Sequence, residues 1–191
     1  MIKSKTDLKE YIRADFANTG EIDSIWKMPI EYFKGNIRAW TKFKFILLLR
    51  YFEYCCNNRS SVLGKLRYLI IKHKFEKRQV KTQIFIHENV FGPGLNLVHP
   101  GFVWADYSSV VGKNCTILPR VLLGKKSPDV PPPSIIIGDN CYIGTGATIL
   151  GPCNIGNNVI IAAGSVVTHD VPDNCMVAGV PAVIKKRLSN K

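Results

Sequence analysis

The stretch G-L-N-L-V-H-P-G-F, residues 94–102, contains the histidine whose type and position best suit chemistry. An imidazole titrates near neutral pH, so it can take a proton from a hydroxyl group that attacks an electrophile. No obvious partner stands beside His99, and an isolated histidine in a strand-like segment is more often a packing or surface residue. The local sequence therefore leaves both roles open, and the surrounding elements have to decide between them.

The other metal-binding and nucleophilic side chains form no obvious constellation. Six cysteines occur without the spacing of a disulfide framework, which favours a reducing environment. A zinc hydrase would need three converging histidines, and one of the four in this chain falls in a helical segment. The four are His73, His87, His99 and His169. We therefore expect no metal site.

From about residue 84, an aliphatic residue recurs at every sixth position. The hexads from Ile137 are I-G-D-N-C-Y, I-G-T-G-A-T, I-L-G-P-C-N, I-G-N-N-V-I, I-A-A-G-S-V and V-T-H-D-V-P. A chain that repeatedly forms a short strand and turns can wind into a triangular prism, with aliphatic side chains stacked inside and small residues at the corners. Cys115, Cys141 and Cys153 occupy the fifth hexad position, so we expect packing residues rather than ligands or nucleophiles.

The hexad spacing breaks between Gly124 and Ile136, where K-K-S-P-D-V-P-P-P-S is too long for a prism corner. We expect a loop that leaves the coil and is stiffened by three consecutive prolines. Loops on a rigid scaffold often line sites, and the alternative here is a passive surface excursion.

Residues 1–82 show helical rather than six-residue spacing, which predicts a small α-helical domain. Thr6 is the expected cap of a first helix that stops near Gly20. A second helix is expected after Pro29, fading at Asn57 and Asn58, and a third from about Ser60 to Gln79. The expected apolar faces are Trp40, Phe43, Leu47, Tyr51 and Tyr54 in the second helix, and Leu63, Leu66, Ile70 and Ile71 in the third.

The net charge of +12 is concentrated in this helical region, which has 18 Lys/Arg against 8 Asp/Glu, compared with 8 against 6 in residues 83–191. No RNA-binding motif or recognition-helix signature accompanies the charge, so we expect no nucleic-acid partner. The most apolar run, F-I-L-L-L at 45–49, is far short of the ~20 residues that span a bilayer, and the first residues lack a secretory apolar run. We expect a cytoplasmic protein.

The basic helices allow two interpretations of the aromatic residues in 40–54 and 63–75. In the first, which we favour, the aromatics form the helical core and the lysines solvate it. In the second, the helices rest on an anionic membrane, where each basic residue near the surface contributes about 1 kcal/mol. The sequence therefore predicts either a helical core alone or peripheral contact at the inner face of the membrane.

The hexads, the motif G-P-G-L-N-L-V-H-P-G, the closing M-V-A-G-V-P-A and the preceding helices resemble the hexapeptide-repeat acyltransferases. Within that family they look most like serine acetyltransferases and their relatives in polysaccharide clusters. The resemblance implies a mainly β protein, with a left-handed parallel β-helix over 83–183. A basic α-helical domain over 1–82 precedes it, and a basic tail over 184–191 follows. It also implies a homotrimer, in which the helical domain can add a contact between two trimers.

The resemblance implies that acetyl-CoA is the co-substrate and that no metal takes part. It assigns His99 as the general base that deprotonates an acceptor hydroxyl as this attacks the thioester, with no covalent enzyme intermediate. Along the acetyl-CoA groove it places Gly124, Lys125, Thr145, Ala163, Lys185 and Lys186. A non-catalytic scaffold with the same fold remains the alternative of a different class.

Several positions depart from the serine acetyltransferase pattern. The second active-site histidine of that enzyme falls at Pro133 or Ser134, and its acidic residues fall at Ile84 or Phe85 and at Val98. An acceptor without an amino group would not need these carboxylates, so we expect a sugar hydroxyl of a surface polysaccharide or its precursor, with serine as the alternative. Asp106 is a candidate to contact the acceptor or orient His99, unless it only caps a turn.

Overall fold

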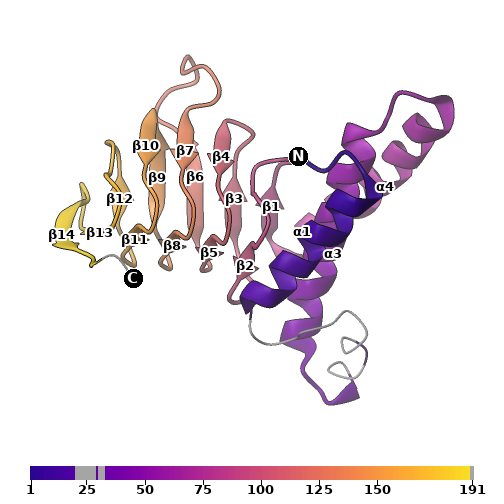
Figure 1. The fold of residues 1–191 in the computed structure, drawn as a ribbon, viewed down its shortest axis with the longest axis horizontal. Coiled ribbons are helices and arrows are strands. Elements are labelled where there is room, and N and C mark those ends of the chain that lie inside the picture. Colours follow the sequence, from indigo (N-terminus) through magenta and orange to yellow (C-terminus); the bar gives the residue numbers. More distant parts are fainter. Residues whose placement is uncertain (20–28, 30–32, 190–191) are drawn as a thin grey trace.

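The computed structural model describes residues 1–19, 29 and 33–189. Figure 1 shows helices packed against one end of a long stack of short strands, with the C-terminal strands at the opposite end. The helices are α1 (Lys5–Thr19), α3 (Ile37–Asn57) and α4 (Val62–Thr82). Among the described residues, none of these helices is long and apolar enough to cross a bilayer.

Side-chain caps begin the described helices α1, α3 and α4. The backbone N–H of Asp7 donates to Ser4 Oγ at 3.0 Å, and the Asp7 carboxylate accepts from the backbone N–H groups of Lys3 and Ser4, both at 2.9 Å. The expected cap at Thr6 is therefore wrong, because Ser4 and Asp7 satisfy the first turn reciprocally. The helix includes Thr19, and its expected end near Gly20 lies outside the described residues.

The predicted apolar face of α3 is only partly right. Phe43 is buried, but Tyr51 is exposed, and Phe45, Ile46 and Leu49 are buried instead. The reason is that α3 packs against α1 and α4, and its buried side chains also join the core of the first coil, so most of its circumference is covered. One-sided amphipathicity is the expectation for a surface helix, and α3 is not one.

The predicted apolar face of α4 is right only for Ile71, which is partly buried and packs against the core. Leu63, Leu66 and Ile70 are 79%, 55% and 49% exposed. Phe75, on the opposite side of the helix, stacks on Phe52 of α3 with ring centroids 4.7 Å apart. Because α4 has apolar side chains on two sides and α3 covers only one, the larger aromatic surface is buried.

The strands form three sheets, with the orders β1-β3-β6-β9-β12, β10-β7-β4 and β14-β13-β11-β8-β5-β2. From β1 to β13, consecutive strands lie in different sheets, so the chain passes from face to face of a prism. All pairings are parallel except that of β13 with β14, which are neighbours in one sheet. The bounds are β1 (Ile84–Ile86), β2 (Asn96–Leu97), β3 (Val103–Ala105), β4 (Ser109–Val111), β5 (Thr116–Ile117), β6 (Val121–Lys125), β7 (Ile135–Ile137), β8 (Tyr142–Ile143), β9 (Thr148–Gly151), β10 (Cys153–Ile155), β11 (Ile160–Ile161), β12 (Val166–Val167), β13 (Cys175–Ala178) and β14 (Val183–Arg187). The fold is a parallel β-helix behind a helical N-terminal region.

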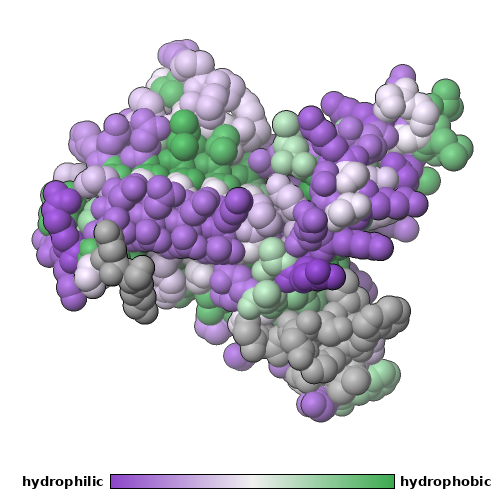
Figure 2. All heavy atoms as spheres, in the orientation of Figure 1, coloured by the Kyte–Doolittle hydropathy of each residue, from purple (hydrophilic) through white to green (hydrophobic). Residues whose placement is uncertain are grey.

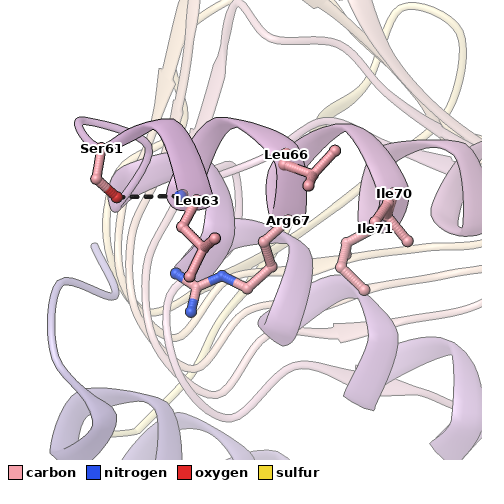
Figure 3. Close-up of a pocket in the computed structure, with 7 residues that line it drawn as sticks. Ser61, Leu63, Leu66, Arg67, Ile70 and Ile71 are labelled. Atoms are coloured by element: carbon pink, nitrogen blue, oxygen red, sulfur yellow. Dashed lines mark hydrogen bonds between the residues drawn. The ribbon is translucent and has the colours of Figure 1, made fainter.

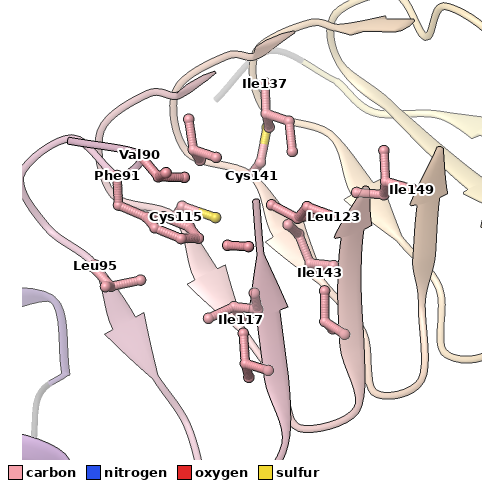
Figure 4. Packing of buried hydrophobic residues seen from close by; sticks show 14 of the residues in the cluster. Val90, Phe91, Leu95, Cys115, Ile117, Leu123, Ile137, Cys141, Ile143 and Ile149 are labelled. Atoms are coloured by element: carbon pink, nitrogen blue, oxygen red, sulfur yellow. The ribbon is translucent and has the colours of Figure 1, made fainter. Parts of the chain in front are cut away.

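The hexads supply the interior of the β-helix, as predicted. Ile143 of β8 pairs with Ile161 of β11, three hexads later, and both are fully buried. The fifth hexad position also points inward, so Cys115 and Cys141 lie among the aliphatic side chains (Figure 4). Burial raises the pKa of the Cys141 and Cys153 thiols to about 11. These cysteines are packing residues, as expected.

A buried ionic cluster joins the helices to the first coil. Arg50 of α3 donates to Asp15 of α1 at 2.7 Å and to Glu53 at 2.9 Å, and all three side chains are at most 1% exposed. The guanidinium also donates to the carbonyls of Phe91 and Gly92, while Asp15 accepts from the backbone N–H groups at 94 and 95. Burial raises the pKa of Glu53, while Arg50 acts in the opposite direction. The cluster fixes the segment that leads into β2.

Candidate active site

His99 lies in the turn between β2 and β3, at the edge where the six-stranded sheet meets the five-stranded sheet. The ladder continues up to the preceding residue, because Val98 N–H donates to the carbonyl of Ile117 at 3.2 Å. Gly101 then turns the chain with a φ of 149°, and a Cβ there would lie 3.2 Å from the Pro119 side chain. The side chain of His99 is exposed, and no described residue forms a hydrogen bond with its imidazole.

A lysine from the helical region fixes the peptide that leads into His99. Lys42 lies on α3 and is only 2% exposed, yet its Nζ donates to the carbonyl oxygen of Val98 at 2.9 Å. Nothing in the sequence singles out this residue as part of a site. Its only signal was a lysine between apolar positions of an expected helix, and a contact across 56 residues cannot be predicted from that.

Two of the predicted cofactor-binding residues share an edge with His99. Thr145 follows β8 and Ala163 follows β11, and these strands lie two and three places from β2 in the six-stranded sheet. Both residues are exposed. The Thr145 hydroxyl donates to the Pro119 carbonyl at 2.8 Å, and Gly164 N–H donates to the Thr145 carbonyl at 2.9 Å. With adjacent strands ~4.8 Å apart, Thr145 lies about 10 Å along this edge from His99.

The other predicted residues near the loop lie on a different edge. Asp106 follows β3, so it stands at the opposite end of that strand from His99, and its carboxylate accepts from Ser108 Oγ at 2.8 Å. Gly124 and Lys125 end β6 beside it, and Lys125 Nζ contacts the Tyr107 hydroxyl at 3.3 Å. Within one chain, Asp106 and Lys125 are therefore brought together with each other but not with His99.

The loop after β6 leaves from this second edge. Lys126 Nζ donates to the carbonyl of Thr168, which holds the start of the loop against a later coil. At the loop's end Ser134 is only 4% exposed, and within the described residues its hydroxyl has no hydrogen-bond partner. Ser134 therefore points inward. Its hydroxyl cannot take the place of the second active-site histidine that the serine acetyltransferase pattern has at this position.

Lys185 and Lys186 lie at the far end of the β-helix. The tail expected over 184–191 is wrong for these two residues, because they lie in β14, which pairs antiparallel with β13. Lys186 lies opposite Met176, and every residue of β14 is exposed. Both lysines are thus held on the surface by a strand that extends the six-stranded sheet.

This arrangement suits acid–base chemistry on a surface edge. His99 presents an accessible imidazole on a turn whose preceding residue, Val98, is hydrogen-bonded to Ile117 through its N–H and to Lys42 through its carbonyl. The turns of successive coils run along the same edge. A base of this kind acts on a hydroxyl brought within hydrogen-bond distance. Over the described ranges 1–19, 29 and 33–189, no three His, Cys, Asp or Glu side chains are grouped to hold a metal ion.

Residues 134–169 match the family of bacterial transferase hexapeptide repeats (six repeats). The chain is similar to serine acetyltransferase from Synechococcus elongatus, with 37% identity over 52% of this chain and 41% of that protein. It is also similar to galactoside O-acetyltransferase from Escherichia coli, with 33% identity over 45% of this chain and 47% of that protein. This chain therefore spans less than half of either relative.

The fold is similar to solved serine acetyltransferases. The enzyme from Neisseria gonorrhoeae superposes with a TM-score of 0.75 and 28% identity, covering 98% of this chain and 69% of that one. The enzyme from Brucella abortus, solved in complex with coenzyme A, gives a TM-score of 0.71 and 26% identity, covering 97% and 69%. The hexads, the stacked coils and these relatives agree: residues 134–169 carry the hexapeptide transferase repeat, and the chain is similar in sequence and fold to acetyltransferases that contain it.

Proposed function

We propose that this protein is an acetyl-CoA-dependent O-acetyltransferase in which His99 is the general base. The observation that carries this proposal is the exposed imidazole of His99, on a turn anchored through Val98 to the buried Lys42. The family's named relatives are acetyltransferases, and one structural neighbour was solved with coenzyme A, which supports acetyl-CoA as the co-substrate.

In the proposed reaction, the acceptor oxygen attacks the thioester carbonyl carbon while His99 takes the hydroxyl proton. The tetrahedral intermediate then collapses, the carbon–sulfur bond breaks, and the CoA thiolate leaves with the proton that the imidazolium returns. No bond to the enzyme forms. Backbone N–H groups in the corner turns would stabilise the oxyanion.

We further propose that the site is completed by a neighbouring copy in a homotrimer of left-handed β-helices. The separation of His99 from Asp106, Gly124 and Lys125 on different edges of one chain supports this, because only a second copy can bring the two edges together. Thr145 and Ala163 would then contact the pantetheine arm through their backbone, and Lys185 and Lys186 would approach the phosphates. Sedimentation equilibrium tests the assembly, and an active monomer would contradict it.

The comparisons favour serine as the acceptor over the polysaccharide sugar expected from the sequence. The Synechococcus relative and both structural neighbours are named serine acetyltransferases. An L-serine-dependent release of CoA from acetyl-CoA is the direct test of this acceptor.

A sugar hydroxyl is the second candidate, on two observations from the site. Val98 precedes His99, so no carboxylate stands there to bind an amino group. Ser134, at the position where the serine acetyltransferase pattern has a second histidine, is buried. The galactoside O-acetyltransferase relative also supports this acceptor class.

The deciding experiment measures CoA release with L-serine and with a panel of galactosides and other sugars. Each acceptor is tested with the unmodified protein, with His99→Ala, and with His73→Ala as a matched control, since His73 is an exposed histidine of α4. We expect that at least one acceptor stimulates CoA release, and that His99→Ala abolishes this release whereas His73→Ala preserves it. The acceptor that stimulates release identifies the substrate class. Absence of release with every acceptor would favour a non-catalytic scaffold.

A further inference from the structure

The first half of α4 exposes an apolar surface that the helical core does not use. This outer face consists of Val62, Leu63, Leu66, Leu69 and Ile70, which are 85%, 79%, 55%, 60% and 49% exposed. Figure 2 shows hydrophobic side chains gathered at the outer tip of the hairpin formed by α3 and α4. Scattered exposed aliphatic residues need no explanation, but five within nine positions on one side of a helix form a contiguous patch.

A hollow borders the outer face and shares Leu63, Leu66 and Ile70 with it. Leu63, Arg67 and Ile71 project along one line of the helix, with Leu66 and Ile70 beside them (Figure 3). The hollow between these side chains is bounded at the start of the helix by Ser61, whose hydroxyl caps Gly64 N–H at 3.0 Å. The cap and the stacking of Phe75 on Phe52 hold α4 in place, so the outer face is presented by a fixed helix.

Basic residues surround this apolar surface. Helix α4 carries seven Lys or Arg residues and a single acidic residue, Glu76, which pairs with Lys72 at 3.8 Å. At 100° per residue, Lys65 and Lys72 lie along one flank of the outer face and Lys74 along the other. An apolar stripe flanked on both sides by lysines is the pattern of a helix that lies in the interface of an anionic bilayer.

We propose that the outer face of α4 is a docking surface for an anionic lipid bilayer. The apolar side chains would enter the boundary between headgroups and acyl chains, while the flanking lysines contact the lipid phosphates. The opposing helix α3 and the β-helix lie on the other side of α4, so the coils with His99 remain clear of the bilayer (Figure 1).

A second copy of the chain fits this surface less well. If two outer faces met, Lys65, Lys72 and Lys74 of each helix would be brought close to the same lysines of the other, with Glu76 alone available to compensate. Like charges placed together across an interface oppose association. An anionic bilayer instead supplies the opposite charge on both flanks at once.

The test is flotation of the full chain with vesicles of phosphatidylcholine alone or with phosphatidylglycerol added. We expect binding to the anionic vesicles at low salt, loss at high salt, and little binding to the neutral ones. Leu63→Ser/Leu66→Ser/Leu69→Ser removes the apolar contact without changing charge and should weaken binding at least about tenfold. No binding of the unmodified chain to anionic vesicles would overturn the proposal.

A pair of matched charge reversals locates the surface. Lys65→Glu should weaken binding by at least about fivefold, the effect of one basic residue near an anionic surface. Lys113→Glu makes the same change in net charge at an exposed lysine of the β-helix and should leave binding unchanged. Equal losses in the two variants would overturn the assignment to α4.

Sedimentation without lipid tests the competing occupant. If the triple serine variant lowers the oligomeric state and the unmodified chain ignores vesicles, the outer face binds a second copy and the proposal is wrong. Acetyl transfer to a soluble acceptor should be unchanged in all these variants, so failure of membrane binding and failure of the proposed enzyme activity are separate results.

Discussion

The Nζ atom of Lys42 lies 2.9 Å from the carbonyl oxygen of Val98, so a buried cation on α3 holds the peptide bond that leads into His99. The helical region is therefore coupled to the candidate base by a direct contact. The same region is tied to residues 91–95 by the Arg50 cluster. Both contacts reach the short segment between β1 and β3 that carries His99.

Replacing Lys42 by Met should lower kcat about tenfold while leaving the KM for acetyl-CoA within twofold. The carbonyl of Val98 would lose the hydrogen bond from Lys42 and the turn would move, whereas Thr145 and Ala163 lie on later coils, after strands two and three places from β2. Steady-state kinetics measure the split. Lys44→Met, at an exposed lysine two positions along, is the control and should behave as the unmodified chain. An unchanged kcat in Lys42→Met would show that the contact does not position His99.

Replacing Arg50 by Met should lower the free energy of unfolding by about 3–5 kcal/mol. The substitution leaves the carboxylates of Asp15 and Glu53 buried without their shared cation, which is more costly than losing a surface ion pair. Urea unfolding measures the effect. Arg13→Met, on the exposed side of α1, serves as the control. A loss below about 1 kcal/mol for Arg50→Met would mean that the cluster is not an important link between helices and coils.

How far the sequence predicts the structure differs between the two halves. In the β-helix each hexad places residues such as Ile143 and Ile161 inside, because the six-residue period itself defines the face that points inward. In the helical region the spacing does not show which of the two apolar sides of α4 packs against α3. The spacing predicts that Leu63 is buried, but Leu63 is exposed and Phe75 makes the contact with α3. The site shows the same limit: His99 could be singled out, but its anchor Lys42 depends on tertiary contact.

The stability of the fold should fall as the pH rises above about 9. Burial raises the pKa of Cys141 and Cys153 to about 11, from an ordinary value of 9.0. Because the folded pKa is the higher one, the stabilisation is complete below pH 9 and is lost as the pH rises through 11. Between pH 8 and 10 each thiol should account for about 1 kcal/mol.

Urea unfolding at pH 8 and pH 10 measures this loss. Cys141→Ala/Cys153→Ala is the comparison, because it removes two of the buried thiols and should give a shallower dependence on pH. The same slope in both proteins would mean that other groups control stability in alkali.

The central claim, that His99 is the base of an acetyl transfer, is tested most directly by the turnover of His99→Ala at saturating acetyl-CoA and acceptor. We expect kcat to fall by at least ~100-fold, with the affinity for acetyl-CoA nearly unchanged, because the imidazole acts on the acceptor proton rather than on the cofactor. Turnover within about twofold of the unmodified protein, or equal losses in kcat and acetyl-CoA affinity, would contradict it.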